Sequence, residues 1–165
     1  MIERPKIKVE LSIADKLVEI IGWVAIVSLW GYTLLNFHSL PDTIPTHFDF
    51  KGEANDYGSK SILLVLPILA TVLLIGMTTL NNYPNVFNYP VPVTEENALR
   101  QYTIATRLIR YMKLSVVILF SLIVYKTVET VSHRADGLGL WFLPLTLAIV
   151  FGPMLFFIYQ AYTKR

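Results

Sequence analysis

Residues 61–80, SILLVLPILATVLLIGMTTL, form an apolar stretch without a single ionisable side chain. A helix needs about 20 predominantly apolar residues to cross a hydrocarbon core about 30 Å thick. Comparable apolar stretches occur at 17–37, 104–126 and 138–160, and charged residues return between them. The sequence therefore predicts an all-α membrane protein, with a bundle of four transmembrane helices forming one domain over residues 1–165.

The composition excludes an ordinary soluble domain. Of the residues, 54% are hydrophobic and 16% are charged, whereas roughly 25% are charged in a typical soluble domain. The chain has no cysteine, which excludes disulfides, thiolate metal sites and cysteine nucleophiles. No cleavable signal peptide is evident, so we expect the stretch 17–37 to remain as the first membrane helix.

The basic residues predict how the chain crosses the membrane, because Lys and Arg near helix ends stay on the cytoplasmic side. One predicted side holds ten of the 14 Lys and Arg residues: Arg4, Lys6, Lys8, Lys16, Arg100, Arg107, Arg110, Lys113, Lys164 and Arg165. The other side holds Lys51, Lys60, Lys126 and Arg134. We therefore expect both termini and the 81–103 loop in the cytoplasm, and the 38–60 and 126–137 loops outside. The net charge of +2 gives no indication of a nucleic-acid partner; the expected partner of these basic residues is the anionic lipid bilayer.

The helix starts can be read from capping residues. Ser12 followed by Asp15 predicts the start of the first helix, and Glu19 is expected to reach back to the headgroups. Thr94 precedes acidic residues, which predicts an N-cap and a third helix from about residue 95, with a long cytoplasmic extension before its membrane span. Within this helix, Arg110 and Lys113 are expected to snorkel to the interface.

The least ordinary segment is the loop 38–60, HSLPDTIPTHFDFKGEANDYGSK. Its prolines exclude helix and its glycines indicate turns, so we expect a structured extracytoplasmic loop between helices one and two. The candidate ligand-binding residues of this loop are Pro41, Asp42, Pro45, His47, Phe48, Asp49, Gly52 and Asp56.

Residues 46–50 alternate in polarity, as in a half-buried strand. This pattern places Phe48 and Phe50 on one face, where we expect them to pack against helix ends. It places His47 and Asp49 on the other face, toward water.

Two pairs of polar side chains fall on the predicted outer side: His47 with Asp49, and Glu129 with His133. If the pairs meet, imidazole and carboxylate ligands suit a divalent cation such as zinc, whose bound water could act as a nucleophile. The alternative is that these groups order the loop by hydrogen bonding. No zincin, nucleophile-elbow or phosphate-loop motif is present, and no catalytic residue is assigned. The middle of each span lacks ionisable residues, which argues against a proton-coupled transporter.

The outer loop resembles a bacterial membrane-domain family of unknown function found in SdpI-type immunity proteins. The resemblance rests on the run 40–48, LPDTIPTHF, followed by Gly52, Asp56 and the run 58–60, GSK. The inner-loop run 88–92, NYPVP, is also similar to these proteins. The resemblance covers about residues 20–125.

This resemblance implies a multi-pass protein of the bacterial inner membrane whose outer loop meets a secreted peptide or small ligand, with a membrane or regulatory protein as a further partner. The leading interpretation is therefore a non-catalytic receptor or immunity-type protein. The alternatives are a metal-dependent membrane enzyme and an accessory subunit of a membrane complex.

Overall fold

The structure, a computed structural model, describes residues 4–163 and contains four long helices. Their bounds are α1 Ile13–Phe37, α2 Val65–Leu80, α3 Ala98–Val131 and α4 Phe142–Thr163. Each is long and apolar enough to cross a membrane, α2 together with the preceding 3-10 turn η1, Lys60–Leu64. The protein is an all-α, four-helix, multi-pass membrane protein, as predicted. Lys164 and Arg165, counted above in the charge distribution, lie outside the described residues.

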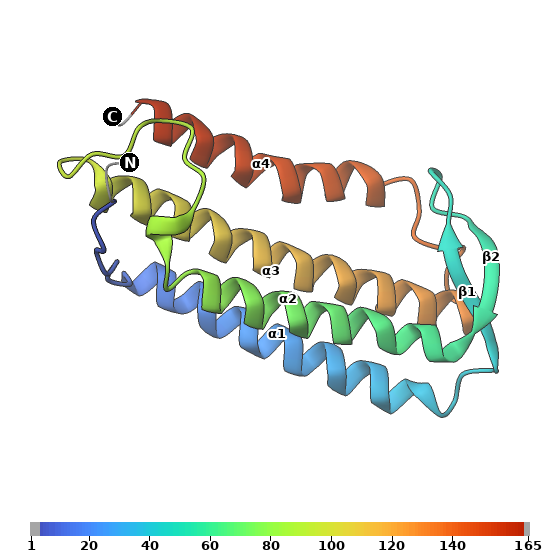
Figure 1. The fold of residues 1–165 in the computed structure, drawn as a ribbon. Coiled ribbons are helices and arrows are strands. Elements are labelled where there is room, and N and C mark those ends of the chain that lie inside the picture. Colours follow the sequence, from blue (N-terminus) through green and yellow to red (C-terminus); the bar gives the residue numbers. More distant parts are fainter. Residues whose placement is uncertain (1–3, 164–165) are drawn as a thin grey trace.

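The helices run alternately up and down, so the chain has two distinct ends (Figure 1). The N-terminal segment before α1, the end of α4 and the 81–97 loop lie at what we call the terminal end. The strands β1, Thr43–Phe48, and β2, Ala54–Ser59, lie at the hairpin end with the 132–141 linker. Helix α3 is central and packs against α1, α2 and α4.

The core lies where α1, α2 and α3 meet. Its fully buried members include Ala70, Leu74 and Val117 from the helices and Ile44 from β1. Most other large apolar side chains of the helices point outward, as expected for surfaces that contact lipid. Helix α4 buries little of its surface, chiefly Phe157 and Ala161 against α3.

The helix starts only partly follow the sequence prediction. The Ser12–Asp15 capping box is present: Ser12 Oγ accepts from the Asp15 amide at 3.2 Å, and the Ser12 amide donates to Asp15 Oδ2 at 2.9 Å. Thr94, however, does not cap α3. Its side chain accepts from the Asn97 amide while the Asn97 side chain accepts from the Thr94 amide. These bonds close a turn, and α3 therefore begins at Ala98 rather than near residue 95.

The N-terminal segment is tied to the 81–97 loop at the terminal end. Arg4 donates to the Phe87 carbonyl at 2.6 Å and stacks over the Tyr89 ring. The Tyr89 hydroxyl donates to the Pro84 carbonyl at 2.8 Å. Burial, together with nearby Tyr102, raises the pKa of the Tyr89 phenol, so this hydroxyl stays protonated and keeps its role as a donor at neutral pH.

Candidate functional site

The predicted outer loop forms an antiparallel β-hairpin rather than a single extended segment. Strand β1 pairs regularly with β2 from Thr43 to Pro45, and irregularities follow on either side of His47. The second strand was not predicted, because the sequence ANDYGS has no apolar alternation. The bulges also break the alternation expected over residues 46–50.

Asp49 holds the hairpin turn. Its Oδ1 accepts from the backbone amides of Lys51 at 2.8 Å and Glu53 at 3.0 Å. The backbone of Asp49 also bonds to Gly52 and Glu53. Its carboxylate is thus engaged locally, which supports the ordering role left open by the sequence.

His47 lies on the exposed side of β1. Its Nδ1 is 2.6 Å from Asn55 Oδ1 on the facing strand. The hairpin therefore pairs His47 with Asn55 rather than with Asp49. Phe48 is half-buried, whereas Phe50 is 90% exposed. The expectation that Phe50 packs against helix ends is wrong, because Phe50 sits in the projecting turn.

The hairpin turn is fastened to the linker before α4. The Leu138 amide donates to the Gly52 carbonyl at 2.7 Å. A Cβ atom at Gly52 would overlap the backbone of Gly139, and one at Gly137 would overlap the Gly52 carbonyl oxygen. All three glycines have positive φ, so both their conformation and the close approach require glycine.

The remaining predicted ligand-binding residues are spread along the hairpin and the segment that leads into it. Asp42 pairs with Lys60 at 3.2 Å and is exposed. Asp56 is exposed and accepts from the Tyr57 amide. Pro41 is exposed, whereas Pro45 is buried. These residues do not converge on one point.

An apolar recess of about 310 Å³, here called the hairpin recess, opens beside β1. Residues 45–48 form one wall, the start of α2 forms another, and Ile123 and Thr127 of α3 with Leu138 of the linker complete it. His47 and Thr46 supply its polar groups from β1. Two predicted site residues besides His47 therefore line it, Pro45 and Phe48.

The four residues of the predicted zinc site are not brought together. His47 lines the hairpin recess, whereas His133 borders a separate recess with Asp136. Glu129 instead lies 3.5 Å from Arg134. Within residues 4–163, no group of three or more His, Asp or Glu side chains could hold a metal ion. The described part of the chain therefore contains no preformed zinc site.

A group of charged side chains, here called the ionic cluster, joins α1 to α3 near the terminal end. Asp15 pairs with Arg107 at 3.0 Å, and Glu19 pairs with Lys113 at 2.5 Å. Arg110 lies between the two carboxylates, 3.8 Å from Asp15 and 3.2 Å from Glu19. Three cationic side chains thus share two carboxylates, leaving one positive charge in excess.

The ionic cluster is largely buried. The side chain of Lys113 is 1% exposed, and its ammonium also donates to Thr78 of α2 at 2.7 Å. The expectation that Arg110 and Lys113 snorkel, and that Glu19 reaches the headgroups, is wrong because these side chains form ion pairs with one another across the helices. A signal was present in the sequence: acids four apart on α1 and bases three apart on α3 each share one helix face.

Comparison with known proteins places the hairpin inside a recurring sequence unit. Residues 24–71 match the family described as Domain of unknown function (DUF1648). A stretch of 75 residues is 39% identical to an uncharacterized protein of Archaeoglobus fulgidus, and the match covers 41% of this chain and 41% of that protein. The chain thus spans under half of the length of that archaeal relative. No solved structure matches.

Proposed function

We propose that this membrane protein is a non-catalytic receptor or immunity-type protein that binds a peptide or small molecule through a bulky apolar group. The hairpin recess is the observation that supports this proposal. Its volume of about 310 Å³ lies at the lower end of the range for ligand pockets. Such a recess suits one aromatic or branched aliphatic group rather than a whole peptide.

The walls of the recess are held by the fold. Pro45 fixes the backbone of β1, and the Leu138–Gly52 hydrogen bond holds the linker beside the hairpin turn. A preformed site loses less free energy in ordering when a ligand binds. The recess is therefore suited to bind a ligand without the hairpin having to fold as the ligand binds.

The polar groups of the recess would orient the ligand. Thr46 carries a hydroxyl and His47 an imidazole, and both lie on the same strand as the apolar wall. A few polar groups beside an apolar pocket commonly supply specificity. The preferred ligand would thus carry a hydrogen-bonding group next to its apolar anchor, as a peptide does.

The charge distribution supports an approach of the ligand to the hairpin recess from outside the cell. We propose that the terminal end lies in the cytoplasm of a bacterial cell and the hairpin end outside its inner membrane, because eight of the 12 Lys and Arg residues within residues 4–163 belong to the terminal end. A secreted peptide would then reach the hairpin recess without crossing the membrane, as the resemblance to SdpI-type immunity proteins implies. The terminal end would be left for a membrane or regulatory protein partner.

The recess can be tested with N-acetyl-tryptophan amide titrated into the protein in nanodiscs, with NMR of labelled Leu and Val methyl groups. We expect saturable shifts at Val65 and Leu66, which line the recess. Thr46→Trp should abolish these shifts by filling the space. Glu53→Trp, placed in the exposed turn, is the matched control and should leave them intact. Equal shifts in both variants, or none in the parent protein, would refute binding in the recess.

A further inference from the structure

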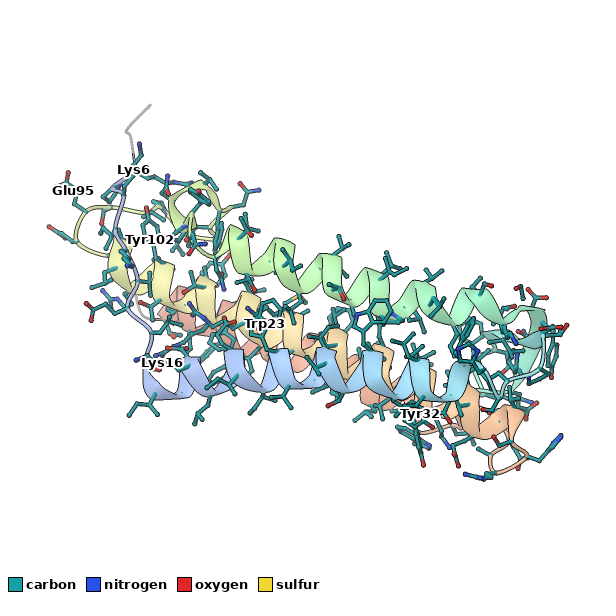
Figure 2. The ribbon with its side chains drawn as sticks, turned by 90° about the horizontal axis from the view of Figure 1, so that it is seen from below. Lys6, Lys16, Trp23, Tyr32, Glu95 and Tyr102 are labelled. Atoms are coloured by element: carbon teal, nitrogen blue, oxygen red, sulfur yellow. The ribbon has the colours of Figure 1, made fainter. Side chains whose placement is uncertain are left out.

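A larger cavity, here called the terminal cavity, lies at the opposite end of the molecule and has a volume of about 570 Å³. Residues 6–11 of the N-terminal segment form one side, and the 81–85 turn forms another. Glu19, Thr78 and Arg110 form its inner wall, where it meets the ionic cluster. Figure 2 shows Lys6 on the extended N-terminal segment at this end and Lys16 at the start of α1.

Arg110 has unused hydrogen-bonding capacity toward this cavity. Its side chain is 7% exposed, and its Nε, 3.2 Å from Glu19 Oε1, is not aligned for a hydrogen bond. In residues 4–163, its guanidinium forms ion pairs with Asp15 and Glu19, and its buried Nε has no hydrogen-bond partner. A guanidinium has five donors in a planar fork that matches phosphate oxygens, and burying unused donors is costly.

The charge around the terminal cavity also favours an anion. The ionic cluster contributes one positive charge in excess, and Lys8 borders the cavity from the N-terminal segment. Glu19 is the one acidic residue among the described residues that line it. Arg110 brings this excess charge to the cavity wall, because it shares its two carboxylate partners, Asp15 and Glu19, with Arg107 and Lys113. An anion in the cavity would balance it.

The other residues that line the terminal cavity indicate which chemical groups the ligand carries beside its anionic group. Ile7, Val9 and Leu11 line the same cavity, so an apolar portion could lie beside the charged one. Asn81 also lines it, and its Oδ1 is buried without a hydrogen-bond partner in the described chain. Because Asn81 Nδ2 donates to the Thr106 carbonyl, that oxygen is free to accept from a ligand hydroxyl.

The position of the cavity matches a headgroup region. It lies at the level where α1 begins and α2 ends, which is where membrane spans meet the polar interface. We propose that the terminal cavity binds a phosphate group, with Arg110 and Lys8 as its main contacts, and that an anionic phospholipid supplies it. This site is independent of ligand recognition at the hairpin recess.

Native mass spectrometry of the purified chain, offered equal amounts of phosphatidylglycerol and phosphatidylcholine, tests the lipid source. We expect one phosphatidylglycerol to be retained in preference to phosphatidylcholine. Lys8→Gln and Arg110→Gln should each weaken retention about tenfold, as for loss of one charge-assisted hydrogen bond. Lys16→Gln and Arg100→Gln are matched controls, since each removes an exposed charge from the same end without lining the cavity.

Because Arg110 also belongs to the ionic cluster, its variant could fail to fold. Lys8 is exposed and lies outside that cluster, so Lys8→Gln tests the site without this complication. Arg110→Lys keeps the charge but loses the planar fork, and should weaken retention less than Arg110→Gln.

A second arm adds either phosphatidylglycerol or inorganic phosphate to lipid-free protein in neutral detergent and measures the thermal unfolding midpoint. Stabilisation by phosphatidylglycerol alone supports a lipid site, and stabilisation by phosphate as well supports the same site with a soluble source. The proposal is overturned if neither ligand binds, or if Lys16→Gln and Arg100→Gln reduce retention as much as Lys8→Gln. That last outcome would indicate general attraction of acidic lipid to a basic surface.

Discussion

Asp49 and His47 are two residues apart in β1 and its turn, yet the structure gives them different contacts. The Asp49 carboxylate accepts two backbone hydrogen bonds that close the turn, whereas His47 is exposed and contacts Asn55. A substitution of Asp49 should therefore affect folding, and a substitution of His47 should affect the ligand recognition that we propose.

We expect Asp49→Ala to lower the free energy of unfolding by about 1–3 kcal/mol, because two backbone donors lose their acceptor. Asp49→Asn retains an acceptor oxygen and should recover most of this loss. His47→Ala should change stability by less than about 0.5 kcal/mol, as is usual for an exposed side chain. Denaturant unfolding in detergent micelles measures all three, and equal stability of Asp49→Ala and His47→Ala would contradict the assigned roles.

Individual residues were predictable where the interaction is local. The Ser12–Asp15 cap follows from a three-residue spacing, and Gly52 was expected at a turn. The ionic cluster was not predicted, because its bonds join residues such as Asp15 and Arg107 that are far apart in the chain. Spacing can place charges on one face of a helix, but it does not say which helices are neighbours.

At the scale of elements, the β-hairpin and the 132–141 linker form one unit. The contact of Gly52 with Gly139, and the Leu138–Gly52 hydrogen bond, join segments that flank different helices. The hairpin recess depends on this contact, because Leu138 forms part of its wall.

We expect Gly52→Ala to separate the hairpin from the linker and to cost about 1–3 kcal/mol, since the added methyl meets backbone at a position with positive φ. Hydrogen exchange should then show loss of protection at the Leu138 amide. Gly31→Ala is the control, because nothing lies within 4 Å of the added Cβ atom on α1. Retained protection at Leu138 in Gly52→Ala would show that the linker is held by other contacts.

At the scale of the whole molecule, hydropathy was sufficient to predict four spans, because a bilayer demands long apolar helices. It was not sufficient to predict that α3 is central and α4 peripheral. Core-facing and lipid-facing positions are equally apolar in a membrane protein, so a sequence such as α4 carries no pattern that identifies its buried face. The packing order emerges only in the assembled bundle (Figure 1).

The orientation of this bundle in a membrane is a prediction for the whole molecule, and the cysteine-free sequence allows a clean test. We expect Lys51→Cys and Asp136→Cys, both exposed at the hairpin end, to react with a membrane-impermeant maleimide on intact bacterial cells. Glu95→Cys, exposed at the terminal end, should react only after permeabilisation. Ile75→Cys, within α2, should stay unlabelled in both conditions.

The labelling result decides the orientation of the bundle and also which class of ligand can reach each site. With the hairpin end outside, the hairpin recess meets secreted peptides and the terminal cavity meets lipid of the cytoplasmic leaflet, whose anionic headgroups match its charge. Labelling of Glu95→Cys on intact cells, with Lys51→Cys protected, would reverse the orientation. The hairpin recess would then face cytoplasmic ligands, and a role in recognising a secreted peptide would be untenable even if the recess binds an aromatic probe.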